Sequence, residues 1–255
     1  MHIVELIMGN YDQIPSKVQE ADYFYHLAWE GARVPYRDDQ KMQENNYMCS
    51  IKAMHAAHLI GCKFFMGSGS QAEYGKMGDS VTEQTKCVPN TEYGKYKLKT
   101  CVELEKLATD YDMRFIWTRI FSIYGKYDYD KSLISSCLKK MSLNESIDLT
   151  ECKQLWDFLY VGDAANVMVK FANTNCKSGI YNLASGDIRP LKDYLNEMKE
   201  ILQSKSKLNF GAVPYGTSGP VDLRPNIDKL KKELKWSPMI SFSKGILLTV
   251  ENKVE

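Results

Sequence analysis

Short apolar runs alternate with longer segments of helical periodicity through most of this chain, and this alternation strongly restricts its fold. A strand, a helix and a second strand in succession form a parallel pair with the helix packed on the sheet. The sequence therefore predicts an α/β protein with a parallel sheet and helices on both faces. The extended runs are residues 64–66, 114–120, 155–161 and 180–183, and the helical segments are 42–59, 93–111, 133–141, 164–172, 191–202, 228–234 and 242–250. Gly61 is expected to end the first of these helices, and Asp163 to cap the segment 164–172.

The composition excludes several classes of function. A chain of 255 residues with 44% hydrophobic and 25% charged residues is typical of an ordinary globular protein. A net charge of +1 does not favour binding to nucleic acid or to anionic lipid. No apolar run approaches the ~20 residues that span a bilayer, and the first residues do not form a secretory signal. The seven cysteines are scattered without a C-x-x-C pair, which predicts free thiols, a cytoplasmic location and no metal site.

The segment 91–97 holds a Tyr-x-x-x-Lys pair that can perform acid/base chemistry. On a helix, Tyr93 and Lys97 project from one face because they are four residues apart. A phenol titrates near pH 10, and an adjacent ammonium group lowers that pKa. The hydroxyl of Ser70, at the end of a strand-like run, can bond the same substrate oxygen. The pair alone is a weak signal, since a solvated helix face would give the same spacing.

Landmarks in order along the chain make the signal specific. From about residue 20 to the C-terminus the sequence resembles the extended short-chain dehydrogenase/reductase family of NAD-dependent nucleotide-sugar epimerases and dehydratases. The segments that carry the resemblance are 22–28 ending in His-Leu-Ala, Asn45-Asn46, 68–75 ending in Tyr-Gly, 89–97 with the Tyr-Lys pair, 119–125, 156–163, 181–186 and 234–238.

The resemblance implies a Rossmann-like doubly wound parallel sheet with a small C-terminal substrate-binding lobe. It implies a core of residues 1–127 and 151–183, a lobe of 128–150 and 184–255, and a homodimer formed through 42–59 and 93–111. The implied activity is that of an NAD(P)-dependent epimerase, dehydratase or ketoreductase acting at C4 of a nucleotide-activated sugar, with NAD favoured over NADP. The implied catalytic residues are Ser70, Tyr93 and Lys97; those near the cofactor are Leu27, Ala28, Trp29, Asn46 and Lys97; those near the substrate are Ser122, Lys131 and Arg224. Lys97 would lower the pKa of Tyr93 and contact the nicotinamide ribose.

The glycine-rich turn with which the family opens is missing from the expected place. Only 25 residues precede His26, less than the ~30 of one βαβ unit. The resemblance therefore implies an N-terminally truncated sheet, with residues 2–8 and 22–28 as the family's third and fourth strands. Either these two strands pair directly, or an edge of the sheet is exposed. The alternative function is a non-catalytic sugar-nucleotide-binding remnant with weak or no dinucleotide binding.

A second glycine pattern, residues 67–72, fits Gly-x-Gly-x-x-Ala after an apolar strand and imitates a dinucleotide fingerprint. Tyr74-Gly75 and Gly78 interrupt the helix that such a fingerprint requires. We therefore interpret the segment as the strand end that carries Ser70.

Overall fold

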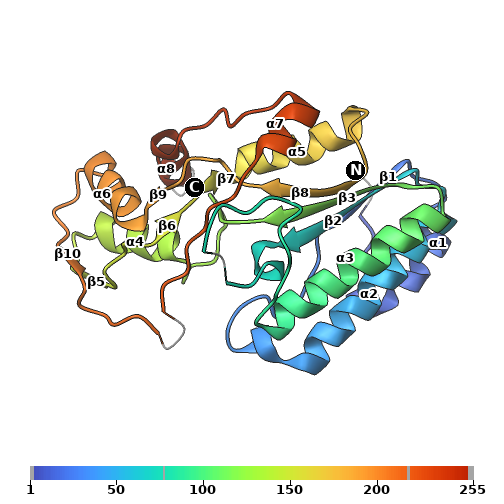
Figure 1. Cartoon of the computed structure of the whole chain (residues 1–255), viewed down its shortest axis with the longest axis horizontal. Helices are drawn as coiled ribbons and strands as arrows, with labels where there is room; N and C mark the ends of the chain where they lie inside the picture. Colours follow the sequence, from blue (N-terminus) through green and yellow to red (C-terminus); the bar gives the residue numbers. More distant parts are fainter. Residues whose placement is uncertain (1–2, 77, 217–218, 252–255) are drawn as a thin grey trace. The chain divides into compact units, whose positions relative to one another are not determined.

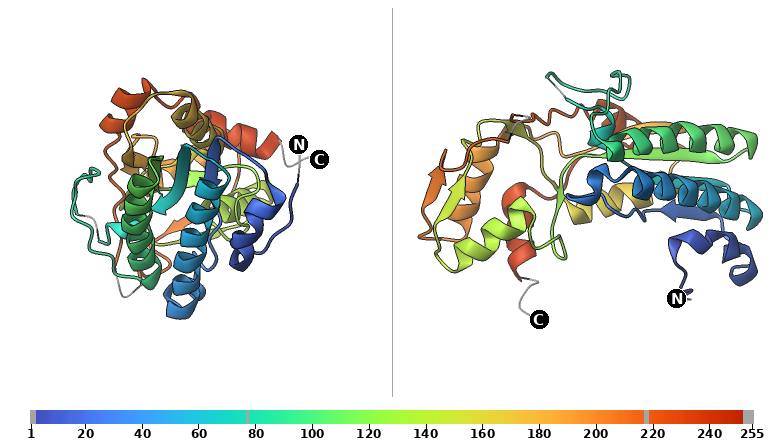
Figure 2. Two further views of the ribbon diagram at one scale, coloured as in Figure 1. Left: turned by 90° about the vertical axis from the view of Figure 1, so that its right-hand side faces the viewer. Right: turned by 90° about the horizontal axis from the view of Figure 1, so that it is seen from below.

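The computed structural model describes residues 3–76, 78–216 and 219–251, whose contacts divide the chain into two compact units (Figures 1 and 2). The first unit consists of residues 1–76, 83–120 and 170–183, and the second of 77–82, 121–169 and 184–255. The polypeptide passes between the units several times, so each unit contains segments that are distant in sequence.

A parallel sheet of four strands forms the centre of the first unit. Its order is β1-β2-β3-β8, and the strands are β1 (Tyr23–His26), β2 (Phe64–Ser70), β3 (Arg114–Ile120) and β8 (Gly179–Leu183). The β2–β3 ladder runs from Phe64 opposite Arg114 to Ser70 opposite Ile120. Because neighbouring strands are parallel, their carboxyl ends lie at the same edge of the sheet. The predicted α/β class with a parallel sheet is confirmed.

Helices pack on both faces of this sheet. On one face α2 (Gln40–Leu59) and α3 (Glu92–Asp110) lie side by side, as Figure 1 shows, and bury an apolar layer that includes Ala53, Phe65 and Leu104. On the other face the last turn of α5 (Val161–Asn173) packs its Phe171 ring against Tyr181, with ring centroids 4.9 Å apart. The Arg114 side chain fixes that turn by donating to the carbonyl of Phe171 at 2.7 Å.

The helices begin and end where local chemistry favours it. The Asp39 carboxylate accepts from the Met42 amide at 3.0 Å and caps α2, and Gly61 after the helix has the positive φ of 84° that favours glycine. At α3 the Thr91 hydroxyl accepts from the Gly94 amide at 3.1 Å. The predictions for 42–59 and 93–111 therefore differ from the observed helices by one or two residues.

The predicted strand at residues 2–8 is wrong over the residues described. Residues 3–7 have no regular structure, a 3-10 helix follows at Met8–Gln13 and a short helix α1 at Ile14–Lys17, and His2 lies outside the described residues. Direct pairing with β1 therefore does not occur there. The reason is burial: the Ile3 and Ile7 side chains are exposed, whereas Tyr11 packs against the core from the 3-10 helix.

In its described residues, the second unit combines five helical segments with three pairs of short strands. Its helices are α4 (Leu133–Ser142), the first turns of α5, α6 (Leu191–Ile201), α7 (Asp228–Leu234) and α8 (Phe242–Glu251). The pairs are β4 (Ile123–Tyr124) with β7 (Leu159–Tyr160), β5 (Ile147–Leu149) with β10 (Leu208–Phe210), and β6 (Leu155–Trp156) with β9 (Arg189–Pro190). Tyr124, Phe158, Tyr194 and Phe242 form an aromatic centre.

Asp163 does not cap α5, contrary to the prediction. The helix begins at Val161, and the Asp163 carboxylate accepts from the amides of Met239 at 3.0 Å and Ile240 at 2.9 Å. A tertiary contact therefore uses the side chain that the local pattern assigned to the helix end.

The glycines of β2 yield the first testable expectation. A Cβ on Gly67 would lie 2.5 Å from the ring of Trp117, whereas a Cβ on Gly9 would meet nothing within 4 Å. Gly67→Ala should lower the free energy of unfolding by roughly 1–3 kcal/mol through overpacking. The control Gly9→Ala should stay within about 0.5 kcal/mol of the wild type. Urea unfolding measures both, and equal stabilities would contradict the packing.

Candidate active site

The three residues predicted to be catalytic all lie in the first unit. Ser70 ends β2, and Tyr93 and Lys97 occupy the first turns of α3, which packs on the same sheet. Gly94 permits the approach, because a Cβ there would lie 3.0 Å from the Ala72 carbonyl carbon, two residues after Ser70. Strand end and helix start are thereby brought together.

The Ser70 side chain and the Arg37 guanidinium both act on the pKa of Tyr93. Burial raises the pKa of Tyr93 above its ordinary value, while a hydrogen bond from the Ser70 side chain and the charge of Arg37 act in the opposite direction. The Arg37 guanidinium lies 5.0 Å from the centroid of the Tyr93 ring. The phenol is therefore protonated at neutral pH in this state.

Lys97 is almost completely buried, with 2% of its surface exposed. Its ammonium donates to the Ser68 carbonyl at 2.6 Å and lies 3.7 Å from the centroid of the Trp29 ring. Burial lowers the pKa of Lys97 to about 7, against the attraction of Glu73. The expectation that Lys97 lowers the pKa of Tyr93 is not met here, because the ammonium faces Ser68 and Trp29 and the opposing cation is Arg37.

Trp29 is fixed over Lys97 by two buried amides of α2. The Trp29 indole donates to Gln43 Oε1 at 2.8 Å, and Gln43 Nε2 donates to the Gly31 carbonyl at 2.9 Å. Asn46 accepts from the Glu30 amide at 2.9 Å and donates to the Glu30 carbonyl at 2.8 Å. Sequence reasoning missed Gln43; its signal was a polar residue three positions before Asn46, on the same buried helix face.

His26 supports this arrangement from the end of β1. Its Nε2 lies 2.9 Å from the Ser50 hydroxyl, and burial, followed by the charge of Lys97, lowers its pKa to about 4. The imidazole is therefore neutral at physiological pH and acts as a packed core group. Leu27 and Ala28, which follow it, are exposed.

The predicted substrate residues lie in the second unit. The Ser122 carbonyl accepts from the Leu159 amide at 2.8 Å, and Lys131 is exposed. The Arg224 guanidinium forms an ion pair with Asp222 at 2.7 Å. Arg224 therefore has a carboxylate partner within its own unit.

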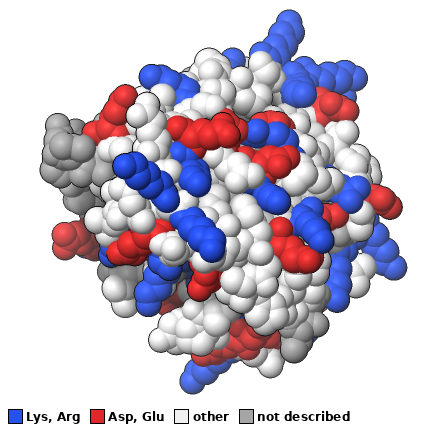
Figure 3. Space-filling model, turned by 90° about the vertical axis from the view of Figure 1, so that its left-hand side faces the viewer, with Lys and Arg blue, Asp and Glu red and all other residues white. Residues whose placement is uncertain are grey.

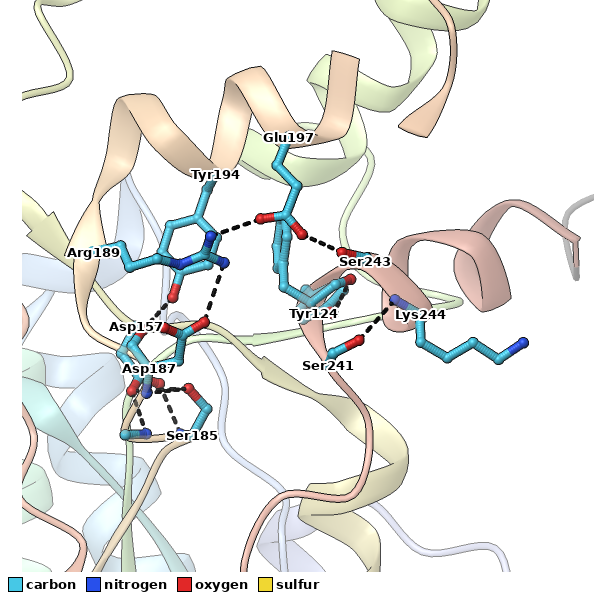
Figure 4. Close-up of polar contacts among 12 residues, drawn as sticks. Tyr124, Asp157, Ser185, Asp187, Arg189, Tyr194, Glu197, Ser241, Ser243 and Lys244 are labelled. Carbon is cyan, nitrogen blue, oxygen red and sulfur yellow. Dashed lines mark hydrogen bonds and ion pairs between the residues drawn. The ribbon is translucent and has the colours of Figure 1, made fainter. Parts of the chain in front are cut away.

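A second polar cluster of that unit joins Asp157, Asp187, Arg189 and Glu197 through hydrogen bonds and ion pairs, as Figure 4 shows, while Arg189 Nε has no hydrogen-bond partner among the described residues. Arg189 pairs with Glu197 at 2.7 Å and with Asp187 at 3.1 Å. The buried Asp157 carboxylate accepts from the Ser185 amide and from the Gly186 amide, at 2.8 and 2.6 Å, and burial raises its pKa to about 6. These contacts fix the loop between β8 and β9.

The acid/base residues fit the ribose end of a nicotinamide dinucleotide. An ammonium has three donors, and that of Lys97 uses one on Ser68, with the rings of Trp29, Trp117 and Tyr93 at 3.7, 5.8 and 5.9 Å. The ammonium therefore has two donors left, which could bind the ribose hydroxyls if these took the place of the Trp29 ring.

The glycine pattern at residues 67–72 is not a dinucleotide fingerprint. It leads into the 3-10 turn Gln71–Glu73 rather than into an α-helix.

Three negative findings apply to the described residues. They contain no group of three or more His, Cys, Asp or Glu side chains that could hold a metal ion. None of their helices is long and apolar enough to cross a membrane. On the face shown in Figure 3, acidic and basic side chains are interspersed rather than gathered by sign.

Because Lys97 is buried, the free energy of unfolding should depend on pH. The folded pKa of about 7 lies below the ordinary 10.5, so the unfolded chain binds more protons between these values. This stability contribution is complete above the unfolded pKa and is lost as pH falls through about 7. Relative to Lys97→Met, the wild type should therefore gain roughly 3 kcal/mol between pH 7 and pH 10.

Urea unfolding at intervals across that range measures the difference between the two proteins. The control is Lys99→Met, an exposed position on the same helix, whose curve should run parallel to that of the wild type. A parallel curve for Lys97→Met as well would contradict the burial of a titrating ammonium.

Curated proteins of similar sequence act on nucleotide sugars according to their names. The chain is 32% identical over 149 residues to CDP-abequose synthase of Salmonella muenchen, covering 57% of this chain and 50% of that protein. It is 24% identical over 251 residues to UDP-glucuronic acid decarboxylase 1 of Arabidopsis thaliana, covering 92% of this chain and 56% of that protein. The chain thus spans about half the length of these two relatives.

Solved structures show the same fold over nearly the whole chain. UDP-glucose 4-epimerase of Thermotoga maritima, with UDP-glucose, superimposes with a TM-score of 0.87 at 20% identity, covering 99% of this chain and 85% of that one. RMD from Pseudomonas aeruginosa, complexed with NADPH, gives 0.86 at 16% identity, covering 98% and 87%. At these identities the likeness concerns the fold alone.

Family membership rests on a separate match. The model of the NAD dependent epimerase/dehydratase family matches residues 2–184, which include β1, β2, α3 and β3 with Ser70, Tyr93 and Lys97. The match covers well over half of the chain, and it agrees with the resemblance to extended short-chain dehydrogenases/reductases. This protein belongs to the NAD-dependent epimerase/dehydratase family.

Proposed function

We propose that the chain interconverts an alcohol and a ketone at C4 of a nucleotide-activated sugar, as an epimerase, dehydratase or ketoreductase. The observation that carries the proposal is the meeting of three groups: the Lys97 ammonium lies 5.9 Å from the centroid of the Tyr93 ring, and the Ser70 side chain acts to lower the pKa of Tyr93. A phenol and a hydroxyl held together suit proton transfer to and from a sugar oxygen.

Each residue has a definite task in this reaction. Tyr93 takes the proton from the sugar hydroxyl on oxidation and returns it on reduction. Ser70 donates a hydrogen bond to the same oxygen. Lys97 donates to the nicotinamide ribose hydroxyls, and the charge of Arg37 favours the phenolate of Tyr93. The dinucleotide, when bound, supplies or accepts the hydride.

The finer assignments extend this proposal. NAD is favoured over NADP, with Leu27, Ala28, Trp29 and Asn46 beside it. Residues 1–127 and 151–183 would form the catalytic core, and 128–150 and 184–255 the substrate lobe. There Ser122, Lys131 and Arg224 would contact the sugar nucleotide, with Arg224 shared between Asp222 and the pyrophosphate. The cytoplasmic location remains a prediction.

A homodimer through α2 and α3 is part of the proposal. Supporting it, the two neighbouring helices expose large apolar side chains, Met48 on α2 and Val102 on α3. A pair of helices from each of two copies would cover such side chains in a four-helix bundle.

A second candidate is sugar-nucleotide binding without turnover. The position of Trp29 favours it, because the indole covers the ammonium that would hold the nicotinamide ribose. The two candidates differ in whether a dinucleotide displaces this ring.

Turnover separates the candidates. The purified chain is mixed with NAD or NADP and with UDP-, dTDP- or CDP-sugars, and reduced dinucleotide and sugar products are followed. Tyr93→Phe should lower turnover about 10²- to 10⁴-fold, because it removes the proton-transfer group. Tyr96→Phe, a half-buried phenol on the same helix, is the matched control and should keep activity.

Binding of a sugar nucleotide without any wild-type turnover would contradict the enzyme proposal and support the second candidate. Equal activity of Tyr93→Phe and wild type would contradict the role of Tyr93.

A further inference from the structure

A fully buried carboxylate lies three residues beyond the serine of the acid/base centre. Glu73 has 0% of its surface exposed. Its Oε1 accepts from the Ser70 amide at 2.8 Å and from the Trp117 indole at 2.9 Å, and its Oε2 accepts from Arg119 Nε at 2.8 Å. A buried carboxylate costs several kcal/mol unless it is paired and hydrogen-bonded, so this placement requires all three partners.

These contacts restrict the Ser70 hydroxyl. The Ser70 amide is held by Glu73, and Ser70 Oγ accepts from the Ala72 amide at 3.2 Å, which together make a capping box. Because Ser70 Oγ accepts from the Ala72 amide, its own O–H group is free to donate to another acceptor. The Ser70 side chain acts to lower the pKa of Tyr93, which favours the phenolate.

The surrounding sequence makes room for the carboxylate. A Cβ on Gly69 would overlap Trp117 Nε1 and lie 2.6 Å from Glu73 Oε1. The Arg119 guanidinium, paired with Glu73, lies 4.5 Å from the centroid of the Tyr74 ring. The glycine between Ser68 and Ser70 thus serves the approach of Trp117 and Glu73 to the strand.

The charge of Glu73 acts on both partners of the acid/base pair. Its attraction opposes the fall in the pKa of Lys97 that burial causes. It also adds to the rise in the pKa of Tyr93, after burial and against Ser70 and Arg37. Tyr93, whose ring centroid lies 5.9 Å from the ammonium, and His26, whose imidazole is neutral at physiological pH, also face Lys97.

We infer that Glu73 is a positioning residue of the acid/base centre: its carboxylate holds the Ser70 main chain so that the hydroxyl proton is directed at Tyr93, and its negative charge acts on the Lys97 ammonium. The inference deepens the proposed function and rests on it for the role of Ser70. The position of the Glu73 carboxylate itself can be tested without a ligand.

Titration of Lys97 tests the placement without any assay of activity. In protein labelled with ¹³C-lysine, the Cε resonance of Lys97, assigned with Lys97→Met, is followed against pH by NMR. Glu73→Gln should lower the Lys97 pKa by roughly one unit, because the attracting charge is lost. The matched control is Asp157→Asn, which removes a buried, hydrogen-bonded carboxylate of the second unit and should leave the Lys97 pKa unchanged. No shift in Glu73→Gln would overturn the inference.

Turnover tests the action through Ser70. Glu73→Gln should lower kcat about 10-fold or more with little change in KM for the sugar nucleotide. Because Glu73 acts through Ser70, the double variant Ser70→Ala, Glu73→Gln should be no slower than Ser70→Ala alone. If the losses of kcat in the two single variants multiply in the double variant, the inference is overturned. A wild type without turnover would contradict the proposed function instead, while the Lys97 titration would still decide the placement.

If Glu73→Gln does not fold, hydrogen exchange of the wild type tests the inference instead. The Ser70 amide proton and the Trp117 indole proton should exchange with deuterium as slowly as the central amides of β3, because both are buried on the Glu73 carboxylate. Exchange at the rate of exposed loops would overturn the inference.

Discussion

The parallel ladder between β2 and β3 is the constraint on which the candidate site depends. It pairs Ser70 with Ile120 at its last position and Gly69 with Arg119 beside it. The ladder thereby carries a serine, a guanidinium and, from Trp117, an indole to one strand end, where Glu73 bonds to all three. Helix α3 adds Tyr93 and Lys97 by packing on the same sheet.

Burial has opposite consequences for the two titrating members of the site. It raises the pKa of Tyr93 and lowers that of Lys97 to about 7, so both groups are pushed toward their neutral forms. Trp29 and the Ser68 carbonyl accommodate the ammonium that remains. In the proposed reaction, ribose hydroxyls would take the place of the Trp29 face and would favour the charged form of Lys97.

Local patterns were sufficient for part of this account. The helical periodicity of residues 93–111 and the apolar run 114–120 correctly predicted a helix and a strand. Gln43 and Glu73 were not recognised, because a polar residue becomes a structural hub only through partners that folding brings near. Asp163 shows the same limit, since amides some 75 residues away took the side chain that local reasoning used as a cap. The strand predicted at residues 2–8 does not form over residues 3–7, because the apolar side chains of Ile3 and Ile7 remain exposed instead of packing on a core.

Calorimetric titration with NADH most directly tests the claim that this cluster serves a nicotinamide dinucleotide. The account predicts binding by the wild type that Lys97→Met weakens about 10-fold or more, since the ammonium is the donor aimed at the ribose. Binding of Tyr93→Phe should remain close to that of the wild type. Equal affinities of the wild type and Lys97→Met, or no binding by either beside clear binding of a UDP-sugar, would contradict it.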